Sequence, residues 1–243
     1  MARAAAVWRG ARVVGVIEET ARARTIVLEV PGWPGHSAGQ HVDVRLTAEG
    51  GYQTQRSYSI ASAPEDARLA LTVERIEDGE VSAYLTGELG VGDELELRGP
   101  IGGYFTWRTR DGGPLLLIAG GSGLVPLMAM LRHRAANAST VDARLVVSSR
   151  SQADVFYRDE LATLAAGAGL TVHHTFTQPS PGWRLARAVD AQMLRTVGPA
   201  PTRRPRIFVC GPTGFVGRAA DLLVGLGHER ATIRAEDFGP IGA

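Results

Sequence analysis

The hydrophobic pattern of the chain changes character once, near residues 106–114. Before that point, apolar residues occur in short runs separated by Pro, Gly and charged clusters; after it, fully apolar runs alternate with helical patterns. The first pattern is typical of an antiparallel barrel or sandwich, the second of a parallel sheet wound with helices. The sequence therefore predicts two domains of different class, residues 1–107 and 114–243, joined by a polar, Gly-rich linker.

The elements expected in each domain can be placed on the chain. In the first domain we expect strands at Arg12–Glu19, Thr25–Val30, His41–Leu46, Gln53–Ile60, Leu69–Arg75 and Glu94–Arg98, with one helix at Val81–Leu89. In the second we expect strands at Leu115–Ala119, Arg144–Ser148, Thr171–Phe176, Arg206–Val209 and Thr232–Arg234. Helices are expected there at Leu124–Arg134, Tyr157–Ala166, Asp190–Val197 and Phe215–Leu226.

Composition excludes several classes of function. The net charge is +1, which gives no reason to expect binding to nucleic acid or to an anionic membrane. All 26 basic residues are arginine, so phosphate contacts must use guanidinium or backbone N–H groups. Cys210 is the only cysteine, which leaves no intrachain disulfide and no Cys-ligated cluster. We expect no metal site, and the lack of a leader or membrane span predicts a cytoplasmic protein.

Three segments carry the residue types that bind phosphates and flat rings. In Arg56–Ser62, alternation places Arg56 and Tyr58 on one side of the strand and Ser57 and Ser59 on the other. Arginine pairs bidentately with phosphate, and tyrosine offers a flat apolar face. Gly79–Ser82 opens a short helix, whose N-terminal N–H groups can hold a phosphate. Ser82 can equally well act only as the helix cap.

Two more segments lie at the carboxyl edge of the predicted parallel sheet, where ligands of open α/β folds bind. Gly121–Pro126 follows an apolar strand and opens a helix, which is the setting of a dinucleotide phosphate turn. Pro126 is tolerated in the first helical turn, because the N–H that it lacks would have no partner there. Cys210-Gly211-Pro212 closes a later strand, and its thiol is either a ring contact or a buried apolar group.

Together with Gly99–Gly102 and Glu236-Asp237-Phe238, these segments occur in a fixed order that resembles the ferredoxin–NADP reductase family. The resemblance covers roughly Arg12 to Phe238. It implies an N-terminal antiparallel FAD-binding β-barrel followed by a doubly wound parallel α/β nicotinamide-binding domain. It also implies that FAD and NAD(P)H are the cofactors.

The resemblance implies a role for individual residues. On the barrel, it places the arginine on the FAD pyrophosphate, the tyrosine on the isoalloxazine ring, and the serine near flavin N5; the residues concerned are Arg56, Ser57, Tyr58 and Ser59. The helix start would hold the second FAD phosphate through Gly79, Val81 and Ser82. The catalytic residues it implies are Ser59, Cys210 and Glu236, with Cys210 beside the nicotinamide and Glu236 assisting proton movement.

In the second domain, the dinucleotide would be bound by Gly121, Ser122, Gly123, Cys210, Gly211 and Pro212, and Phe238 would cover the flavin face. Three departures from the family pattern are visible. Ser122 replaces a threonine of the family's turn, and five residues follow Phe238. NADP-using members of the family carry Ser-Arg where this chain has Thr177-Gln178, so the usual arginine is missing there. Thr177 is still expected to line the cofactor site, and Arg150 or Arg184 would take the 2′-phosphate, which favours NADPH over NADH.

The expected activity is therefore that of an FAD-dependent NAD(P)H oxidoreductase that reduces an external acceptor, either a ferredoxin-like carrier or a partner redox enzyme. Two alternatives remain open at this point: a reductase that uses free flavin as its substrate, and a flavoprotein subunit that transfers electrons without using nicotinamide. The sequence names neither the acceptor nor the oligomeric state.

Overall fold

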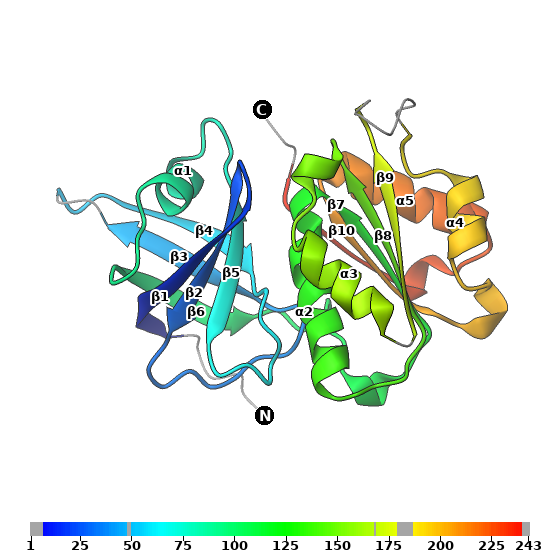
Figure 1. The fold of residues 1–243 in the computed structure, drawn as a ribbon, viewed down its shortest axis with the longest axis horizontal. Coiled ribbons are helices and arrows are strands. Elements are labelled where there is room, and N and C mark those ends of the chain that lie inside the picture. The colour runs from blue at the N-terminus through cyan, green and yellow to red at the C-terminus, as the bar shows by residue number, and fades with distance from the viewer. Residues whose placement is uncertain (1–6, 48–49, 168, 179–186, 240–243) are drawn as a thin grey trace.

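The computed structural model describes residues 7–47, 50–167, 169–178 and 187–239. Two sheets lie side by side, an antiparallel one built from the N-terminal part of the chain and a parallel one built from the rest (Figure 1). Every strand and helix expected from the sequence is present, with shifts at some ends. The predicted fold class is confirmed.

The antiparallel sheet has six strands in the order β4-β3-β6-β1-β2-β5. They are β1 (Trp8–Thr20), β2 (Ala23–Glu29), β3 (His41–Thr47), β4 (Gln53–Ser59), β5 (Leu69–Glu74) and β6 (Glu94–Ile101). The edge strands β4 and β5 approach each other where Ile60 bridges Leu71, and helix α1 (Glu80–Gly87) contacts both edges. The sheet thereby closes into a barrel, whose interior is filled by aliphatic side chains.

The parallel sheet has five strands in the order β11-β10-β7-β8-β9. They are β7 (Leu115–Gly120), β8 (Ala143–Ser149), β9 (Leu170–Phe176), β10 (Arg206–Gly211) and β11 (Ile233–Asp237). The helices are α2 (Leu124–Ala136), α3 (Arg158–Ala166), α4 (Ala191–Val197) and α5 (Thr213–Gly225). Alternate residues of β7 point to opposite faces: Leu117 and Ala119 pack in the core with α2, and Leu116 and Ile118 in the core with α4 and α5.

The order of the strands reverses at β7, which lies between β10 and β8. The loops that follow the carboxyl ends of β7 and β10 therefore run in opposite directions, which creates space for a ligand between them. The Gly121 turn and Cys210 stand at these two ends. The predicted doubly wound sheet thus brings both segments to one place.

The segment predicted to be a polar linker takes part in the core instead. Trp107 is buried among the residues that pack between β7 and α2, its ring lies edge-on to His133, and its indole N–H donates to the carbonyl of Gly112 at 2.9 Å. Phe105 is buried in the same cluster. Residues 106–114 are predicted to be a linker from their overall polarity, and that polarity gives no sign that Trp107 is buried.

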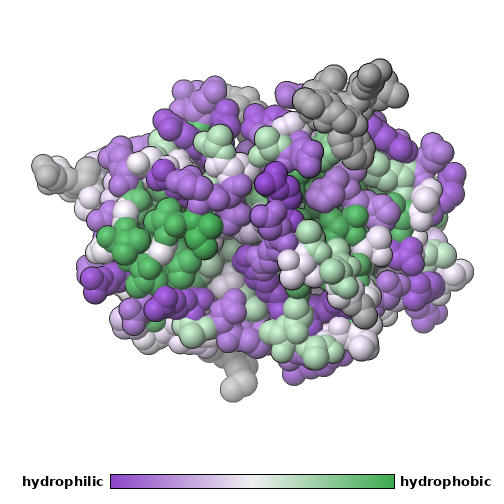
Figure 2. All heavy atoms as spheres, viewed as in Figure 1, coloured by the Kyte–Doolittle hydropathy of each residue, from purple (hydrophilic) through white to green (hydrophobic). Residues whose placement is uncertain are grey.

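Further contacts between the two halves are polar. The hydroxyl of Tyr157 donates to Thr72, and the carboxylate of Glu19 accepts the backbone N–H of Tyr157 at 3.0 Å. Arg132 donates to the carbonyl of Ala61 at 2.7 Å. Figure 2 shows a polar band along this boundary, and an apolar patch on the barrel over β1 and β2. The halves are therefore joined by directional bonds as well as by apolar packing.

The largest shifts at element ends have local causes. Strand β1 begins earlier than predicted because Trp8–Arg12 pairs with β6, and Arg45 covers the Trp8 ring at 4.2 Å. Strand β11 runs on through Glu236 and Asp237, which pair with Cys210 and Gly211. Neither stretch shows the alternation of apolar residues that reveals a strand in sequence.

Candidate functional site

The turn after β7 is built so that backbone, and no side chain, faces the strand ends. Gly121 has φ +53°, a conformation that favours glycine. A Cβ on Gly123 would lie 2.1 Å from the carbonyl oxygen of Cys210. Only glycine therefore fits at this position, and the turn packs directly on the end of β10. Close packing of this kind is what the glycines of a dinucleotide phosphate turn provide.

Helix α2 starts immediately after this turn. Its N-cap is Gly123, which has no side chain to cap the first N–H groups, and Pro126 stands within the first turn. The N–H of Leu124 donates to the carbonyls of Gly121 and Ser122, and the helix dipole makes this end attractive to an anion. Ser122 lies between the two glycines and is half-buried. Three of the residues predicted to bind the dinucleotide, Gly121, Ser122 and Gly123, thus form one continuous turn at the start of α2.

Cys210 lies next to this turn at the end of β10. It pairs in register with Ala119 on one side and with Glu236 on the other. Its side chain is buried, and this burial raises the pKa of the thiol well above its usual value, so the sulfur stays protonated at neutral pH. Gly211 and Pro212 then lead into helix α5. Cys210 is therefore a small, uncharged group at the switch point.

Near the strand ends, the carboxyl group of Glu236 has a strongly raised pKa. Its Oε2 is buried and has no hydrogen-bond partner among the described residues. Its Oε1 lies 3.7 Å from Nδ1 of His41, which belongs to β3 of the barrel. Burial, and to a lesser degree the neighbouring charge of Asp237, raises the pKa of Glu236 to about 7. The carboxyl is therefore poised to gain or lose a proton near neutral pH.

His41 is a residue that the sequence did not point to. It pairs in register with Ser59 on β4, so it stands between Ser59 and Glu236. Burial lowers the pKa of His41, whereas Asp43 raises it to a lesser degree. The contact between His41 and Glu236 therefore joins two groups whose neutral forms are favoured, and we describe it as a polar contact and not as an ion pair.

The structure thus gathers the three residues predicted to be catalytic where the two halves meet. Cys210 and Glu236 are paired in register on adjacent strands, and Ser59 is paired in register with His41, whose ring lies 3.7 Å from Glu236. No signal in the sequence singles out His41, because a lone histidine on a barrel strand resembles any other outward-facing polar residue.

Strand β4 confirms the predicted alternation. Arg56 and Tyr58 lie opposite the core residues Val44 and Val42, whereas Ser57 and Ser59 lie opposite Asp43 and His41. The exposed guanidinium of Arg56 donates to the carbonyl of Gln55 at 2.8 Å, and no carboxylate of the described residues pairs with it. Tyr58 packs against the barrel core, and burial raises its pKa, so its phenol remains neutral.

Ser57 is committed to a contact within the barrel. Its hydroxyl donates to Asp43 at 2.6 Å, and Arg98 pairs with the same carboxylate at 2.6 Å. Its predicted role as a cofactor ligand therefore has no support from a free hydroxyl.

At the start of α1, the hydroxyl of Ser82 bonds within the turn. The helix begins at Glu80, and its N-cap, Gly79, leaves the first N–H groups without a side-chain cap. Ser82 is buried, and its hydroxyl donates to the carbonyl of Gly79 at 3.0 Å and accepts the N–H of Ile76 at 3.1 Å. The hydroxyl of Ser82 thus shapes the turn, and the groups left for a phosphate are the N–H groups around Val81.

Two of the residues predicted near the 2′-phosphate, Arg150 and Thr177, lie on neighbouring segments after β8 and β9. Arg150 follows β8 and faces two carboxylates, Glu74 at 3.8 Å and Asp154 at 3.5 Å. Thr177 follows β9, and its backbone N–H donates to the carbonyl of Ser149 at 3.0 Å. Arg184 lies outside the described residues. Arg150 therefore has two carboxylate neighbours.

Phe238 lies just past β11 on the same edge as Cys210. Its N–H donates to the carbonyl of Gly211 at 3.3 Å, and its ring is 48% exposed. An aromatic ring this exposed is available to cover a flat ligand.

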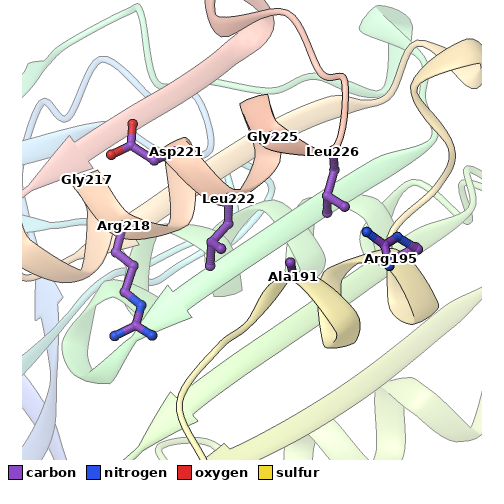
Figure 3. Close-up of a pocket in the computed structure, with 8 residues that line it drawn as sticks. All are labelled: Ala191, Arg195, Gly217, Arg218, Asp221, Leu222, Gly225 and Leu226. Carbon is purple, nitrogen blue, oxygen red and sulfur yellow. The ribbon is translucent and has the colours of Figure 1, made fainter.

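One cavity lies away from these residues. A cavity of about 610 Å³ opens between α4 and α5, lined by Ala191, Arg195, Gly217, Arg218, Asp221, Leu222, Gly225 and Leu226 (Figure 3). These residues lie on the face of the sheet away from α2 and the barrel. We place the site by its chemistry, at the strand ends, and not by the size of this hollow.

Two features are lacking in the described part of the chain. No group of three or more His, Cys, Asp or Glu side chains there is arranged to hold a metal ion. None of the helices in the described ranges is long and apolar enough to cross a membrane.

The fold and the site define a class: a two-domain protein with a ring- and phosphate-binding barrel and a dinucleotide-binding sheet. Comparisons with known proteins agree. Residues 18–106 match the family model described as an oxidoreductase FAD-binding domain, and residues 117–221 match an oxidoreductase NAD-binding domain. The chain belongs to the ferredoxin–NADP reductase family, as the sequence predicted.

Individual relatives place the chain more closely. It is 34% identical to ferredoxin–NADP reductase B of Sorangium cellulosum, over 83% of this chain and 84% of that protein. It is 32% identical to the glycine betaine monooxygenase reductase subunit of Pseudomonas aeruginosa, over 94% of this chain but only 64% of that protein. Among solved structures, the FAD/NAD-binding domain of a Vibrio cholerae nitric oxide dioxygenase superposes with a TM-score of 0.84 at 26% identity, covering 96% and 99% of the two chains.

Proposed function

We propose that the protein is an FAD-dependent reductase that takes a hydride from NAD(P)H and passes the electrons to an external redox protein. The observation that carries this proposal is the meeting of the two halves: the barrel strand with Ser59 and the sheet edge with Cys210 are joined through His41 and Glu236. A ring held on the barrel and a ring held on the sheet would meet at this point. The two family models support both cofactors.

The residues at the barrel fit FAD. Arg56 has an exposed guanidinium with no carboxylate partner among the described residues, and the uncapped start of α1 at Gly79 offers N–H groups. We assign the pyrophosphate to these two groups, because one suits each phosphate. Tyr58 and Phe238 would flank the ring. Bound FAD supplies an acceptor for a hydride and can release the electrons singly or in pairs.

The residues at the sheet fit a nicotinamide dinucleotide. The turn Gly121–Gly123 and the start of α2 would hold its pyrophosphate, and the uncharged thiol of Cys210 would allow a flat ring to approach closely. Ser59 would donate a hydrogen bond beside the reacting atoms. Glu236 would hold a proton on its buried carboxyl, with His41 as the neighbouring group to which that proton can move.

The electron acceptor is proposed to be a separate protein. The chain offers a single cysteine, Cys210, and so cannot itself form a cysteine-ligated iron–sulfur cluster. The Pseudomonas relative is named as the reductase subunit of a monooxygenase, and this chain spans 64% of its length. We infer an oxygenase component or a ferredoxin-like carrier as the acceptor. We place the reaction in the cytoplasm, where a pool of reduced nicotinamide is available.

The purified protein tests this proposal directly. It should be yellow, keep its flavin through desalting, and release FAD on heating, as identified by mass spectrometry. Rapid mixing with NADH or NADPH should bleach the flavin in milliseconds to seconds. A protein that loses its flavin on desalting but reduces added flavin is a free-flavin reductase. One that keeps FAD and is reduced by neither nucleotide is a non-catalytic electron-transfer subunit.

A further inference from the structure

One ion pair joins the barrel to the edge of the nucleotide-binding sheet. Glu74 ends β5 of the barrel, and its Oε1 lies 3.8 Å from Nη2 of Arg150, which follows β8. The same carboxylate reaches the phosphate turn: a Cβ on Gly121 would lie 3.8 Å from Oε2 of Glu74. The barrel therefore places a negative charge between the turn after β7 and the residue after β8.

Arg150 does not neutralise this charge alone, because it has a second carboxylate partner. Asp154 lies 3.5 Å from its guanidinium and is fixed by two further bonds, from the N–H and the hydroxyl of Ser151 at 3.0 Å and 2.6 Å. Two carboxylates thus share one guanidinium, and the group of Glu74, Arg150 and Asp154 has a net charge of −1. Its three side chains are 27%, 45% and 32% exposed, so solvent screens them only in part.

The position of this group determines what it can recognise. In a doubly wound sheet, the pyrophosphate sits on the turn after the first strand, and the residue after the second strand lies beside the 2′ position of the adenosine ribose. Here the first strand is β7 and the second is β8, so Arg150 occupies the second place. A free arginine there would favour a 2′-phosphate, whereas a carboxylate favours a ribose hydroxyl.

We propose that Glu74 is a specificity-determining residue: by holding Arg150 and by adding its own negative charge, it selects the dinucleotide without a 2′-phosphate, NADH. The inference rests on the proposed use of a nicotinamide dinucleotide and goes beyond it by naming which one. The 2′-phosphate of NADPH adds close to two negative charges at the point where the carboxylates stand. NADH has a neutral hydroxyl at that position, and this hydroxyl can donate a hydrogen bond to a carboxylate.

Adenosine fragments test the inference without hydride transfer. The FAD-loaded protein is titrated by calorimetry with 5′-AMP and with adenosine 2′,5′-bisphosphate, which differ only in the 2′-phosphate. The wild-type protein should bind 5′-AMP more tightly. In Glu74→Gln, affinity for the bisphosphate should rise at least fivefold, while affinity for 5′-AMP changes less than twofold. The ratio of kcat/KM for NADPH to that for NADH should rise by a similar factor.

Two matched variants show whether the effect depends on the charge of Glu74 at this position. Glu77→Gln removes the same charge from a carboxylate that is 85% exposed and paired with Arg22, and it should leave the ratio unchanged. Glu74→Asp keeps the charge and should keep the preference for NADH. Tighter binding of the bisphosphate by the wild-type protein, or equal gains for both fragments in Glu74→Gln, would overturn the inference. A protein that binds neither fragment and is reduced by neither dinucleotide would instead refute the proposed function.

Discussion

At the scale of single residues, the site depends on groups that are kept neutral in an environment that disfavours charge. The thiol of Cys210 and the carboxyl of Glu236 are neighbours on adjacent strands, and burial raises the pKa of both. His41 responds in the opposite sense, because burial lowers its pKa. All three changes favour the uncharged form, which suits a place where two rings must lie close together.

Glu236 should make stability depend on pH. Its pKa is about 7 in the folded protein and near 4.5 when unfolded, so between these values the folded state binds the extra proton. The stabilisation is complete below about pH 4.5, declines as the pH rises, and is lost above about 7. We measure the free energy of unfolding in urea. The value for Glu236→Gln, relative to the wild type, should rise by roughly 2 kcal/mol between pH 4.5 and pH 8, after allowance for partial exposure. Parallel curves for the two proteins would contradict the assignment.

Arg56 should matter for holding FAD and for little else. Its guanidinium is exposed and donates only to a neighbouring carbonyl, so Arg56→Ala removes no ion pair within the described residues. Loss of a charge-assisted bond to the pyrophosphate should weaken FAD binding by about 1.5–3 kcal/mol. Fluorescence of the released flavin after dialysis measures this. Arg203→Ala, an exposed arginine on the opposite edge of the sheet, serves as the control. Equal FAD retention in the two variants would remove Arg56 from the site.

Cys210 should affect the rate of hydride transfer more than the binding of flavin. Its thiol sits at the end of β10, on the sheet and not on the barrel. Cys210→Ala keeps the side chain small and apolar, so we expect FAD to stay bound while flavin reduction at saturating NAD(P)H slows by roughly tenfold or more. Stopped-flow absorbance measures the rate. Reduction at the wild-type rate would show that Cys210 is only a core residue.

Among the contacts between elements, the one between the turn after β7 and the end of β10 shapes the site most directly. Gly123 rests against the backbone of Cys210 and Gly211, and Gly120 rests against the ring of Phe215. A loop and a strand from distant parts of the sequence are thus packed backbone to backbone. The alternation of strands and helices predicted this meeting, because both segments follow strands that flank the reversal point. The lack of space at Gly123 could not be predicted, because the spacing of glycines does not say which backbone lies opposite.

Gly123→Ala tests this contact. The added methyl group would meet the Cys210 carbonyl, which is backbone and cannot turn away, so we expect a loss of about 1–3 kcal/mol or more in the free energy of unfolding. NAD(P)H affinity should fall as well, because the turn must shift. The control is Gly214→Ala in α5, where nothing lies within 4 Å of the new methyl and alanine favours the helix. Similar stabilities of the two variants, measured by denaturant unfolding, would contradict the close packing.

In the molecule as a whole, the two halves are held together by contacts that no pattern in the sequence predicts. Each half was predictable alone, since its periodicity is set by its own core. The contacts between halves pair single side chains, such as Tyr157 with Thr72 and His41 with Glu236, that lie 85 or more positions apart in the chain. Isolated polar residues of this kind carry no periodic signal. This is why the resemblance points to Ser59, Cys210 and Glu236, whereas nothing in the sequence points to His41.

Tyr157→Phe should weaken this joint without altering either core. The change removes the hydroxyl that donates to Thr72, while Thr72 keeps its bond to Thr25 at 2.7 Å. We expect a loss of about 1 kcal/mol in the free energy of unfolding. Tyr52→Phe is the control, since that hydroxyl is on an exposed ring and makes only a long contact with Glu80. A Tyr157→Phe protein as stable as the control would show that the bond between Tyr157 and Thr72 does not help to hold the halves together.

The burial of Trp107 and Phe105 also limits how the two halves could be exchanged in evolution or in the laboratory. Both side chains precede the second sheet in the chain, yet both belong to its core. A fragment or chimera cut at residue 114 would leave that core without two of its largest rings, and it should aggregate when expressed. A junction placed ahead of Phe105 would carry them along. The segment that has to be exchanged together with the second sheet is therefore longer than the sheet, and it begins before Phe105.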